Sequence, residues 1–338
     1  MAITEEIEIT KLTNMNDELF DMAKKGEWDK VVDIYRTIPE AQTAKFSNSG
    51  DTALHIAVSE GKKKIVKQLI HQIISSKEGR KEALEIKNNE GNTPLHVALS
   101  KGNEAMCQLI AGLYPPLVGV GNANRETPIF LAVQDGKKEA FLKLLKGAIE
   151  GDTSGEEGKE GKEEKNGKDV AEESIRNFLF HMARKDKWDE VVKIYEWTPL
   201  AHKTKITNSG DTALHIAVSH DNKERVEELI KEIISNGEEG KEALKVKNEQ
   251  GNTPLHVAAS MGSVRMCECI AQVDPSLVAV RNKNGETPLF VTALYGQQKA
   301  FLCLLAACDT KDICEGSRRN DGDTILHVAL AGDYFGEH

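Results

Sequence analysis

The sequence lacks the long apolar run and the leader segment that would direct a chain into or across a membrane. No stretch reaches roughly 18 consecutive apolar residues, so a transmembrane helix is not expected. Met1–Asp17 is acidic and polar, without a basic segment followed by an apolar one, so a secretory signal is not expected either. An excess of positive charge is also missing, because the 338-residue chain carries a formal net charge of −10. That balance disfavours nucleic acid and anionic membrane surfaces as partners.

Cysteine is scarce and lacks the spacing of a metal or redox motif. The chain has six cysteines and no C-x-x-C pair. We therefore expect free thiols in a reducing compartment rather than a zinc site or a disulfide framework. The six are Cys107, Cys267, Cys269, Cys303, Cys308 and Cys314.

Catalytic and cofactor motifs are missing as well. Gly119-Val120-Gly121 begins like a phosphate-binding loop, but it lacks the third glycine and the helix that follows in a dinucleotide-binding fold. No Ser-His-Asp, Cys-His or paired-carboxylate arrangement recurs, and the many acidic residues are expected on solvated helix faces. The sequence therefore predicts no enzyme activity, no catalytic residue, no cofactor and no bound metal.

What the chain does contain is one motif that returns along its length. Gly50-Asp51-Thr52-Ala53-Leu54-His55-Ile56-Ala57-Val58-Ser59 recurs unchanged at 210–219. Looser copies begin at Gly91, Glu126, Gly251, Glu286 and Gly322. A motif that returns every few dozen residues is typical of a solenoid, in which short units stack along one axis.

Each copy has the features of a short helix. Thr52 can cap the helix, and Pro94 in the next copy suits the first helical position, where its missing N–H costs nothing. Leu54, Ala57 and Val58 then form one apolar stripe. Residues suited to a left-handed turn at the helix end are Gly61, Gly102, Gly136, Gly262 and Gly296, with Asp221-Asn222 in one copy.

The motif resembles the ankyrin repeat, in which a Thr-Pro-Leu-His-x-Ala helix is followed by a Gly turn and a second helix. The resemblance covers nearly the whole chain apart from an N-terminal tail and one linker. It implies an all-α ankyrin-repeat solenoid with short hairpin-like loops, with eight full repeats plus a truncated ninth. Because the ninth has no second helix, Leu326, Val328 and Leu330 should lack cover, and residues 320–338 should exchange their amide hydrogens quickly.

The predicted domains follow from a break in the pattern and from a duplication. The stretch 148–175 is rich in Gly, Lys and Glu and has no apolar period, which predicts a disordered linker. A solvated linker is favoured there over a docking segment for a basic partner. Beyond it the motifs reappear at a constant offset of 160 residues. The expected organisation is a disordered tail (1–15), a first block of four repeats (16–147), the linker (148–175) and a second block of four repeats plus a partial fifth (176–338).

Details within the blocks resemble plant ankyrin-repeat proteins in which a PGG-type domain of membrane helices follows the repeats. The resembling stretches include Asp274-Pro275-Ser276-Leu277-Val278, Gly285-Glu286-Thr287-Pro288-Leu289-Phe290 and Arg318-Arg319-Asn320-Asp321-Gly322. The resemblance implies a role in stress or defence signalling, with relatives that are membrane-anchored. The membrane domain is absent from this chain.

Three functions compete on this basis. The first is a cytoplasmic, non-enzymatic scaffold or adaptor that binds a protein partner. The second is the cytoplasmic regulatory ankyrin region of a membrane protein, which the resemblance would place at the cytoplasmic face of the plasma membrane. The third is an enzyme, which no residue in the sequence supports.

Five histidines share one motif position: His55, His96, His215, His256 and His327. Successive repeats would place them about 10 Å apart, too far to share a metal ion. We expect each to hold the Thr and backbone of its own turn. Trp28 and Trp188, which are equivalent in the two blocks, are expected in the core.

The residues just before the Gly turns suggest where a partner binds. In the ankyrin family these residues and the loop tips line the concave face. The first block has Ser59-Glu60, Ser100-Lys101 and Gln134-Asp135, and the second has Ser219-His220, Ser260-Met261 and Leu294-Tyr295. Charged residues before the turns of the first block are thus replaced by largely apolar ones in the second. We favour a partner site over neutral drift as the reason for this replacement. The predicted anchors are Met261, Leu294 and Tyr295, and the predicted rim residues are His220, Asn252 and Glu286.

Overall fold

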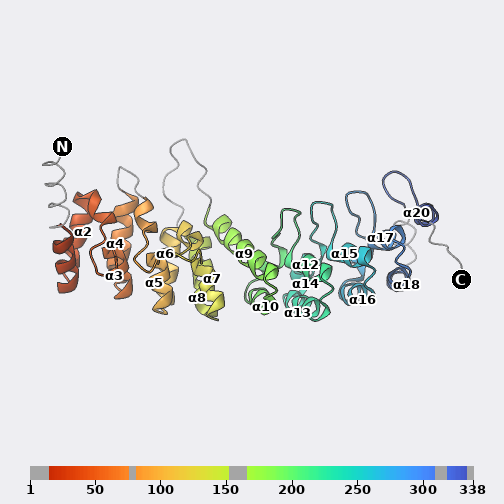
Figure 1. The fold of residues 1–338 in the computed structure, drawn as a ribbon, viewed down its shortest axis with the longest axis horizontal. Helices are drawn as coiled ribbons and strands as arrows, with labels where there is room; N and C mark the ends of the chain where they lie inside the picture. The colour runs from red at the N-terminus through yellow and green to blue at the C-terminus, as the bar shows by residue number, and fades with distance from the viewer. Residues whose placement is uncertain (1–14, 76–80, 152–165, 309–317, 333–338) are drawn as a thin grey trace. The chain divides into compact units, whose positions relative to one another are not determined.

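The computed structural model describes residues 15–75, 81–151, 166–308 and 318–332 (Figure 1). These residues form an all-α fold of short helices that are joined by tight turns and hairpin-like loops. In the described ranges, β pairing is limited to two isolated bridges, Lys205 with Thr212 and Arg318 with Thr324. The predicted all-α repeat solenoid is confirmed.

The chain divides into two compact units, Met1–Ser174 (unit 1) and Ile175–His338 (unit 2). The helices of unit 1 are a helix over 15–25, α2 (Trp28–Thr37), α3 (Ala53–Ser59), α4 (Lys63–Ile74), α5 (Pro94–Ser100), α6 (Glu104–Leu113), α7 (Pro128–Gln134), α8 (Lys138–Glu150) and the start of α9 (Gly167–Arg184). Its 3-10 turns are η1 (Pro39–Thr43), η2 (Lys81–Glu85) and η3 (Pro115–Gly119).

Unit 2 repeats this order. Its helices are the end of α9, α10 (Trp188–Trp197), α11 (Leu200–Lys203), α12 (Ala213–Ser219), α13 (Lys223–Ile234), α14 (Gly237–Lys241), α15 (Pro254–Met261), α16 (Val264–Val273), α17 (Pro288–Leu294), α18 (Gln298–Ala307) and α20 (Ile325–Ala331). Its 3-10 turns are η4 (Glu242–Lys245) and η5 (Pro275–Ala279).

The first helix of each repeat begins and ends where the motif predicts. Helix α3 starts directly after Thr52, and Pro94 is the first residue of α5. The turn after α3 uses Gly61 at a φ of 69°, in the left-handed region that a side chain disfavours. Asp221 holds the same turn in unit 2 with a φ of 53°, as expected of a residue that tolerates this conformation.

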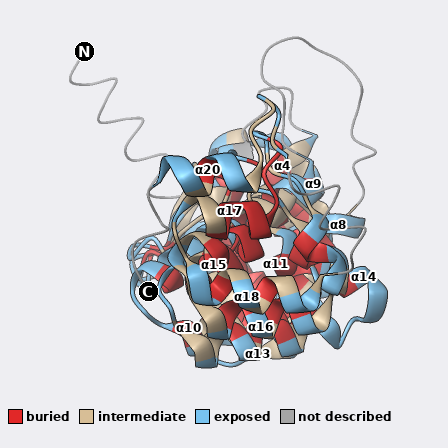
Figure 2. Cartoon of the chain, turned by 90° about the vertical axis from the view of Figure 1, so that its right-hand side faces the viewer, coloured by how far each residue is buried: buried red, intermediate tan, exposed pale blue. Residues whose placement is uncertain are grey.

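The core lies between the first and second helices of the repeats. Leu54 and Val58 of α3 are buried, and so are Leu69 and Ile73 of α4. Burying one such side chain contributes roughly 1.5–3 kcal/mol, so a short helix gains its stability from this packing. Figure 2 shows buried residues in the interior and exposed ones at the periphery. Trp28 and Trp188 are buried as well, so their predicted core role is confirmed.

The helices on either side of the predicted linker are longer than the sequence analysis allowed. Helix α8 continues to Glu150 and α9 begins at Gly167, so both boundaries of the 148–175 segment are corrected. Val170, Ala171 and Ile175 of α9 are buried. The sequence analysis missed this apolar side because it treated these residues together with the adjoining Gly- and Glu-rich run. Residues 152–165 lie outside the described residues, as does all of the predicted tail except Met15.

The ninth unit consists, in its described part, of a hairpin loop and α20. This helix packs against α17, and Val328 is only 6% exposed, so the prediction that Val328 lacks cover is wrong. Leu326 and Leu330 are each 60% exposed, as expected for residues without a covering helix. Rapid hydrogen exchange of this unit stays a prediction.

Candidate partner-binding surface

The motif histidines connect neighbouring repeats. His55 Nδ1 lies 2.9 Å from Thr52 Oγ1, which confirms the predicted link to its own turn. Its Nε2 lies 2.9 Å from the carbonyl oxygen of Asn92 in the next repeat. This second bond was missed, because its partner is 37 residues away and no local pattern indicates it. The equivalent Nε2–carbonyl distances are 2.9, 3.0 and 3.1 Å for His96 with Glu126, His215 with Asn252 and His256 with Glu286.

These histidines are held in the neutral form. The Thr253 N–H donates to His256 Nδ1 at 3.2 Å, so Nε2 carries the proton that is donated to the Glu286 carbonyl. Burial lowers the pKa of His256 to about 4, and the bond to the carbonyl only partly opposes this effect. Burial also lowers the pKa values of His55, His96 and His215. These four histidines therefore have a structural role at neutral pH.

The described residues bring together no candidate metal centre. No group of three or more His, Cys, Asp or Glu side chains in these ranges could hold an ion. The five described cysteines form no disulfide with one another, and Cys314 lies outside the described residues. Burial raises the pKa of both Cys107 and Cys267 to about 12, so these two thiols stay protonated and unreactive. The predicted absence of a metal and a cofactor stays a prediction.

The residues before the turns of unit 2 form a continuous row. Ser263 Oγ donates to Asp221 Oδ1 at 2.8 Å, which joins the turns after α12 and α15. Gln297 Nε2 donates to the Ser260 carbonyl at 3.4 Å, which joins the turns after α15 and α17. We call the residues that directly precede these three turns, His220, Met261 and Tyr295, the turn row.

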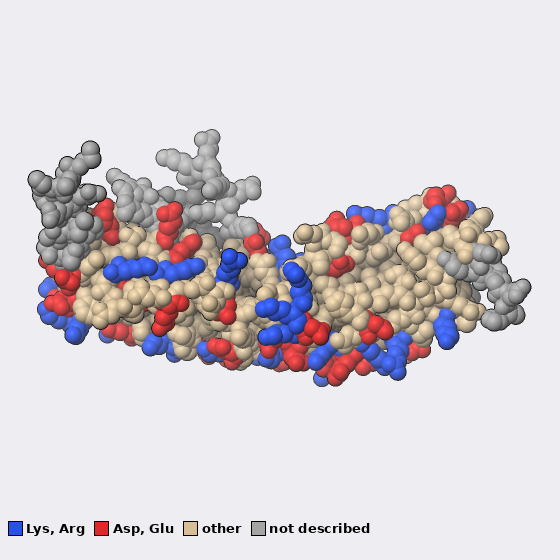
Figure 3. Space-filling view, viewed as in Figure 1, with Lys and Arg blue, Asp and Glu red and all other residues tan. Residues whose placement is uncertain are grey.

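The turn row presents apolar side chains to solvent. Met261 is 39% exposed and Tyr295 is 55% exposed, while Leu294 beside it is half-buried. His220 at the other end is exposed. In Figure 3, uncharged surface extends over α12, α15 and α17, and the charged side chains gather along its edges. Four of the six predicted site residues thus lie in the turn row or directly beside it.

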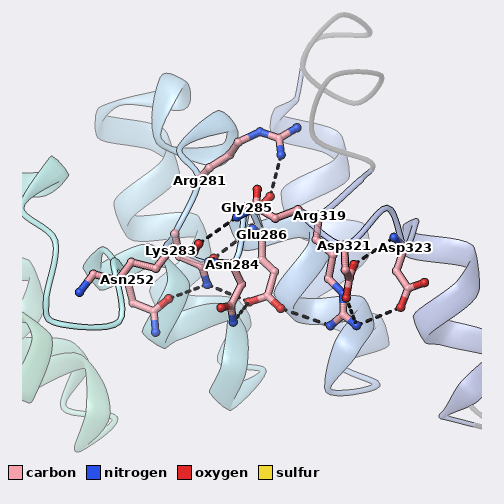
Figure 4. A network of polar contacts seen from close by, with 11 residues as sticks. Asn252, Arg281, Lys283, Asn284, Gly285, Glu286, Arg319, Asp321 and Asp323 are labelled. Atoms are coloured by element: carbon pink, nitrogen blue, oxygen red, sulfur yellow. Dashed lines mark hydrogen bonds and ion pairs between the residues drawn. The ribbon is translucent and has the colours of Figure 1, made fainter.

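The other two predicted site residues serve the scaffold. Glu286 is only 5% exposed, and its carboxylate accepts from Asn282 Nδ2 at 2.8 Å and lies 3.6 Å from Arg319 Nη1 (Figure 4). Asn252 Oδ1 also accepts from Asn282 Nδ2, at 3.0 Å. The rim role predicted for Glu286 is therefore wrong, and Asn252 is half-buried in the same network. Both side chains tie successive hairpin loops together, which the sequence alone did not indicate.

The same positions in unit 1 are exposed but charged. Glu60, Lys101 and Asp135 stand where unit 2 has the turn row, and all three are exposed. Asp135 forms an ion pair with Lys137 at 2.8 Å. The copied backbone thus accepts either kind of side chain, so core packing does not account for Met261 and Tyr295.

Helix pairs that repeat along the chain, joined by hairpin loops and cross-repeat histidine bonds, define a helical-repeat scaffold. A family model described as "Ankyrin repeats (3 copies)" matches residues 19–115 and 179–279, more than half of the chain. The chain belongs to the ankyrin-repeat family, and these repeats indicate a role in protein–protein interaction.

One curated relative is a Saccharomyces cerevisiae protein named "Probable 26S proteasome regulatory subunit p28". The two sequences are 34% identical over 100 residues, which is 29% of this chain and 40% of the relative. The match thus spans about two fifths of the length of the yeast protein. The proteasome role in that name describes the yeast protein and is not assigned to this chain.

Proposed function

We propose that this chain is a non-enzymatic scaffold that binds a protein partner through Met261, Leu294 and Tyr295, with His220 at the rim. The observation that carries the proposal is the exposure of Met261 and Tyr295, at positions where unit 1 has charged residues. Exposed apolar and aromatic residues that adjoin one another are typical of interaction sites.

The chemistry of these side chains suits a binding anchor. Tyr295 offers a large contact area with few rotatable bonds and a hydroxyl group that can remain hydrated. Met261 adapts its shape to irregular apolar surfaces. Half-buried Leu294 lies beside them and would be covered further by a partner. As in other ankyrin-repeat proteins, we place this surface on the concave face.

The cellular setting of the scaffold rests on the resemblance to plant PGG-type ankyrin proteins. It supports a cytoplasmic role in plant stress or defence signalling. The alternative is the cytoplasmic regulatory region of a membrane protein, which the same resemblance supports. Each helix in the described part of the chain is too short or too polar to cross a bilayer. Sequencing the transcript beyond the His338 codon distinguishes the two, because helices of about 20 apolar residues there would favour the alternative.

The binding proposal is tested with matched double variants in the two units. Proximity labelling with the full chain identifies its neighbours by mass spectrometry. The Leu294→Asp/Tyr295→Ala variant should lose the partner, and Gln134→Ala/Asp135→Ala in unit 1 should keep it. Both proteins should retain their unfolding temperatures, because the replaced side chains are at least partly exposed. Equal labelling of the partner by both variants would contradict the proposal.

A further inference from the structure

The turn row continues into a cluster of cations at the end of α9. Lys185 precedes the turn after α9, as His220 precedes the turn after α12. The rings of Trp188 and His220 lie edge-on with their centroids 6.2 Å apart, so these two turns are neighbours. Arg184 and Lys187 flank Lys185, and all three are exposed.

These cations form no ion pair within the described part of unit 2. The two nearest acidic residues in the sequence have other partners. Asp186 accepts from Trp188 Nε1 at 2.8 Å, and Asp189 lies 2.8 Å from Arg225 Nη1.

The Arg184 guanidinium lies 5.6 Å from the centre of the Phe180 ring, an exposed aromatic side chain. Burial lowers the pKa of neighbouring His181, and so do the charges of Lys185, Arg184 and Lys187. The three cations therefore act on one small region. An anionic group placed there would meet several positive charges at once.

The equivalent helix end in unit 1, at the end of the helix over 15–25, has ion-paired side chains instead of unpaired cations. There Asp21 lies 3.5 Å from Lys25 Nζ, and Glu27 accepts from a lysine of the next helix at 2.8 Å. The equivalents of the two acids, 160 residues further on, are His181 and Lys187. The helix and turn are kept, so the fold does not require the added positive charge.

Unit 2 therefore presents one row with two chemical halves. In Figure 3, Lys and Arg side chains lie over α10 and the adjacent end of α9, with Asp and Glu beside them, and mostly uncharged surface lies over the later repeats. Three repeat steps separate Lys185 from Tyr295. At 8–10 Å for each pair of packed helices, these steps span roughly 25–30 Å, the length of about eight or nine extended residues.

We infer that the partner of this surface is a protein segment with an acidic half and an apolar half. The acidic half binds Arg184, Lys185 and Lys187, and the apolar half binds Met261 and Tyr295. This inference rests on the proposed function and adds the chemistry of the partner to it. Cations alone would also suit nucleic acid or an anionic membrane, but the adjoining exposed apolar half favours a peptide.

The test is selection of displayed random peptides of about twelve residues on the full chain. Wild-type protein should select peptides that carry acidic residues in one half and apolar or aromatic residues in the other. The Lys185→Glu/Lys187→Glu variant should select peptides without the acidic half. A synthetic copy of a selected wild-type peptide should bind this variant about fivefold or more weakly. The matched unit 1 variant, Lys24→Glu/Lys25→Glu, should bind it like the wild type.

Other outcomes would overturn the inference in distinguishable ways. If Tyr295→Ala abolishes peptide binding but Lys185→Glu/Lys187→Glu does not, the acidic half is wrong and the proposed function stands. If no peptide is selected, or if neither Tyr295→Ala nor Lys185→Glu/Lys187→Glu weakens peptide binding, the inference and the proposed function fail together. If a labelled single-stranded oligonucleotide, or vesicles rich in anionic phospholipid, bind these lysines more tightly than the peptide does, the partner is not a peptide.

Discussion

In unit 1 the turn after α7 carries Gln134 and Asp135, and in unit 2 the corresponding turn, after α17, carries Leu294 and Tyr295. The threonines that cap these two helices are equivalent, and each accepts from the backbone N–H of a phenylalanine at 3.2 Å. The two helices thus begin alike, and the difference lies in the residues just before the turns that follow them. Packing constrains the buried positions of both units, whereas the exposed residues before the turns can change without disturbing the core.

A pair of core variants tests whether the two units have the same scaffold. Leu95→Ala in α5 and Leu255→Ala in α15 each remove a fully buried side chain, so each should lower the free energy of unfolding by about 2–5 kcal/mol. Chemical denaturation followed by circular dichroism measures this cost, and hydrogen exchange shows which unit opens. A cost in one unit less than half of that in the other would show that the two cores are not equivalent.

A surface exchange tests the difference between the units. Replacing Met261 by Lys and Tyr295 by Asp gives unit 2 the side chains of unit 1 and should weaken partner binding by about 2 kcal/mol or more. The reciprocal variant, Lys101→Met/Asp135→Tyr, should leave partner affinity unchanged. Titration calorimetry measures both. Full binding by the unit 2 variant would remove the basis for assigning the partner to that unit.

Acid should destabilise both units, because each contains buried neutral histidines. The native pKa of His256 is about 4, below the ordinary value of 6.5, so the unfolded chain binds more protons between these values. Stability is therefore complete above about pH 6.5 and should fall by about 1–3 kcal/mol as the pH drops toward 4. Denaturation midpoints measured from pH 7 to 4.5 test this. A stability that does not change between pH 7 and 5 would contradict it.

The smallest expected effect concerns the turn that differs between α3 and α12. Gly61→Ala should cost about 1 kcal/mol, because a side chain disfavours its left-handed φ of 69°. Asp221→Gly should change stability by only about 0.5 kcal/mol, because relief of backbone strain is offset by loss of the bond from Ser263. Thermal unfolding of the two variants gives the comparison. A large loss in Asp221→Gly would show that the Ser263 bond outweighs the backbone term.

Local interactions made the repeat readable from the sequence. A capping threonine, a proline at the first helical position and a glycine in the left-handed turn each act within about four residues of the chain. Thr52, Pro94 and Gly61 therefore indicated the start and end of their helices correctly. The apolar stripe of α3 likewise predicted which of its side chains are buried.

The site was only partly predictable for the same reason. Exposure of Met261 and Tyr295 follows from their place before a turn, so the motif sufficed to find them. Glu286 stands in a loop that looked solvated, yet Asn282 and the distant Arg319 enclose its carboxylate. The cations at the end of α9 escaped notice because their importance depends on which turn lies beside them.

The sequence by itself determined most of the helices, their caps and the repeat that packs them, because these depend on spacing along the chain. The tertiary structure decided what meets across repeats: the His55 bond to Asn92, the burial of Glu286, and the contact between Trp188 and His220. Such contacts join residues about 30–40 positions apart, and only stacking brings them within hydrogen-bond or van der Waals distance. For that reason the motif indicated the family, while the chemistry of the proposed partner surface depends on how the repeats stack.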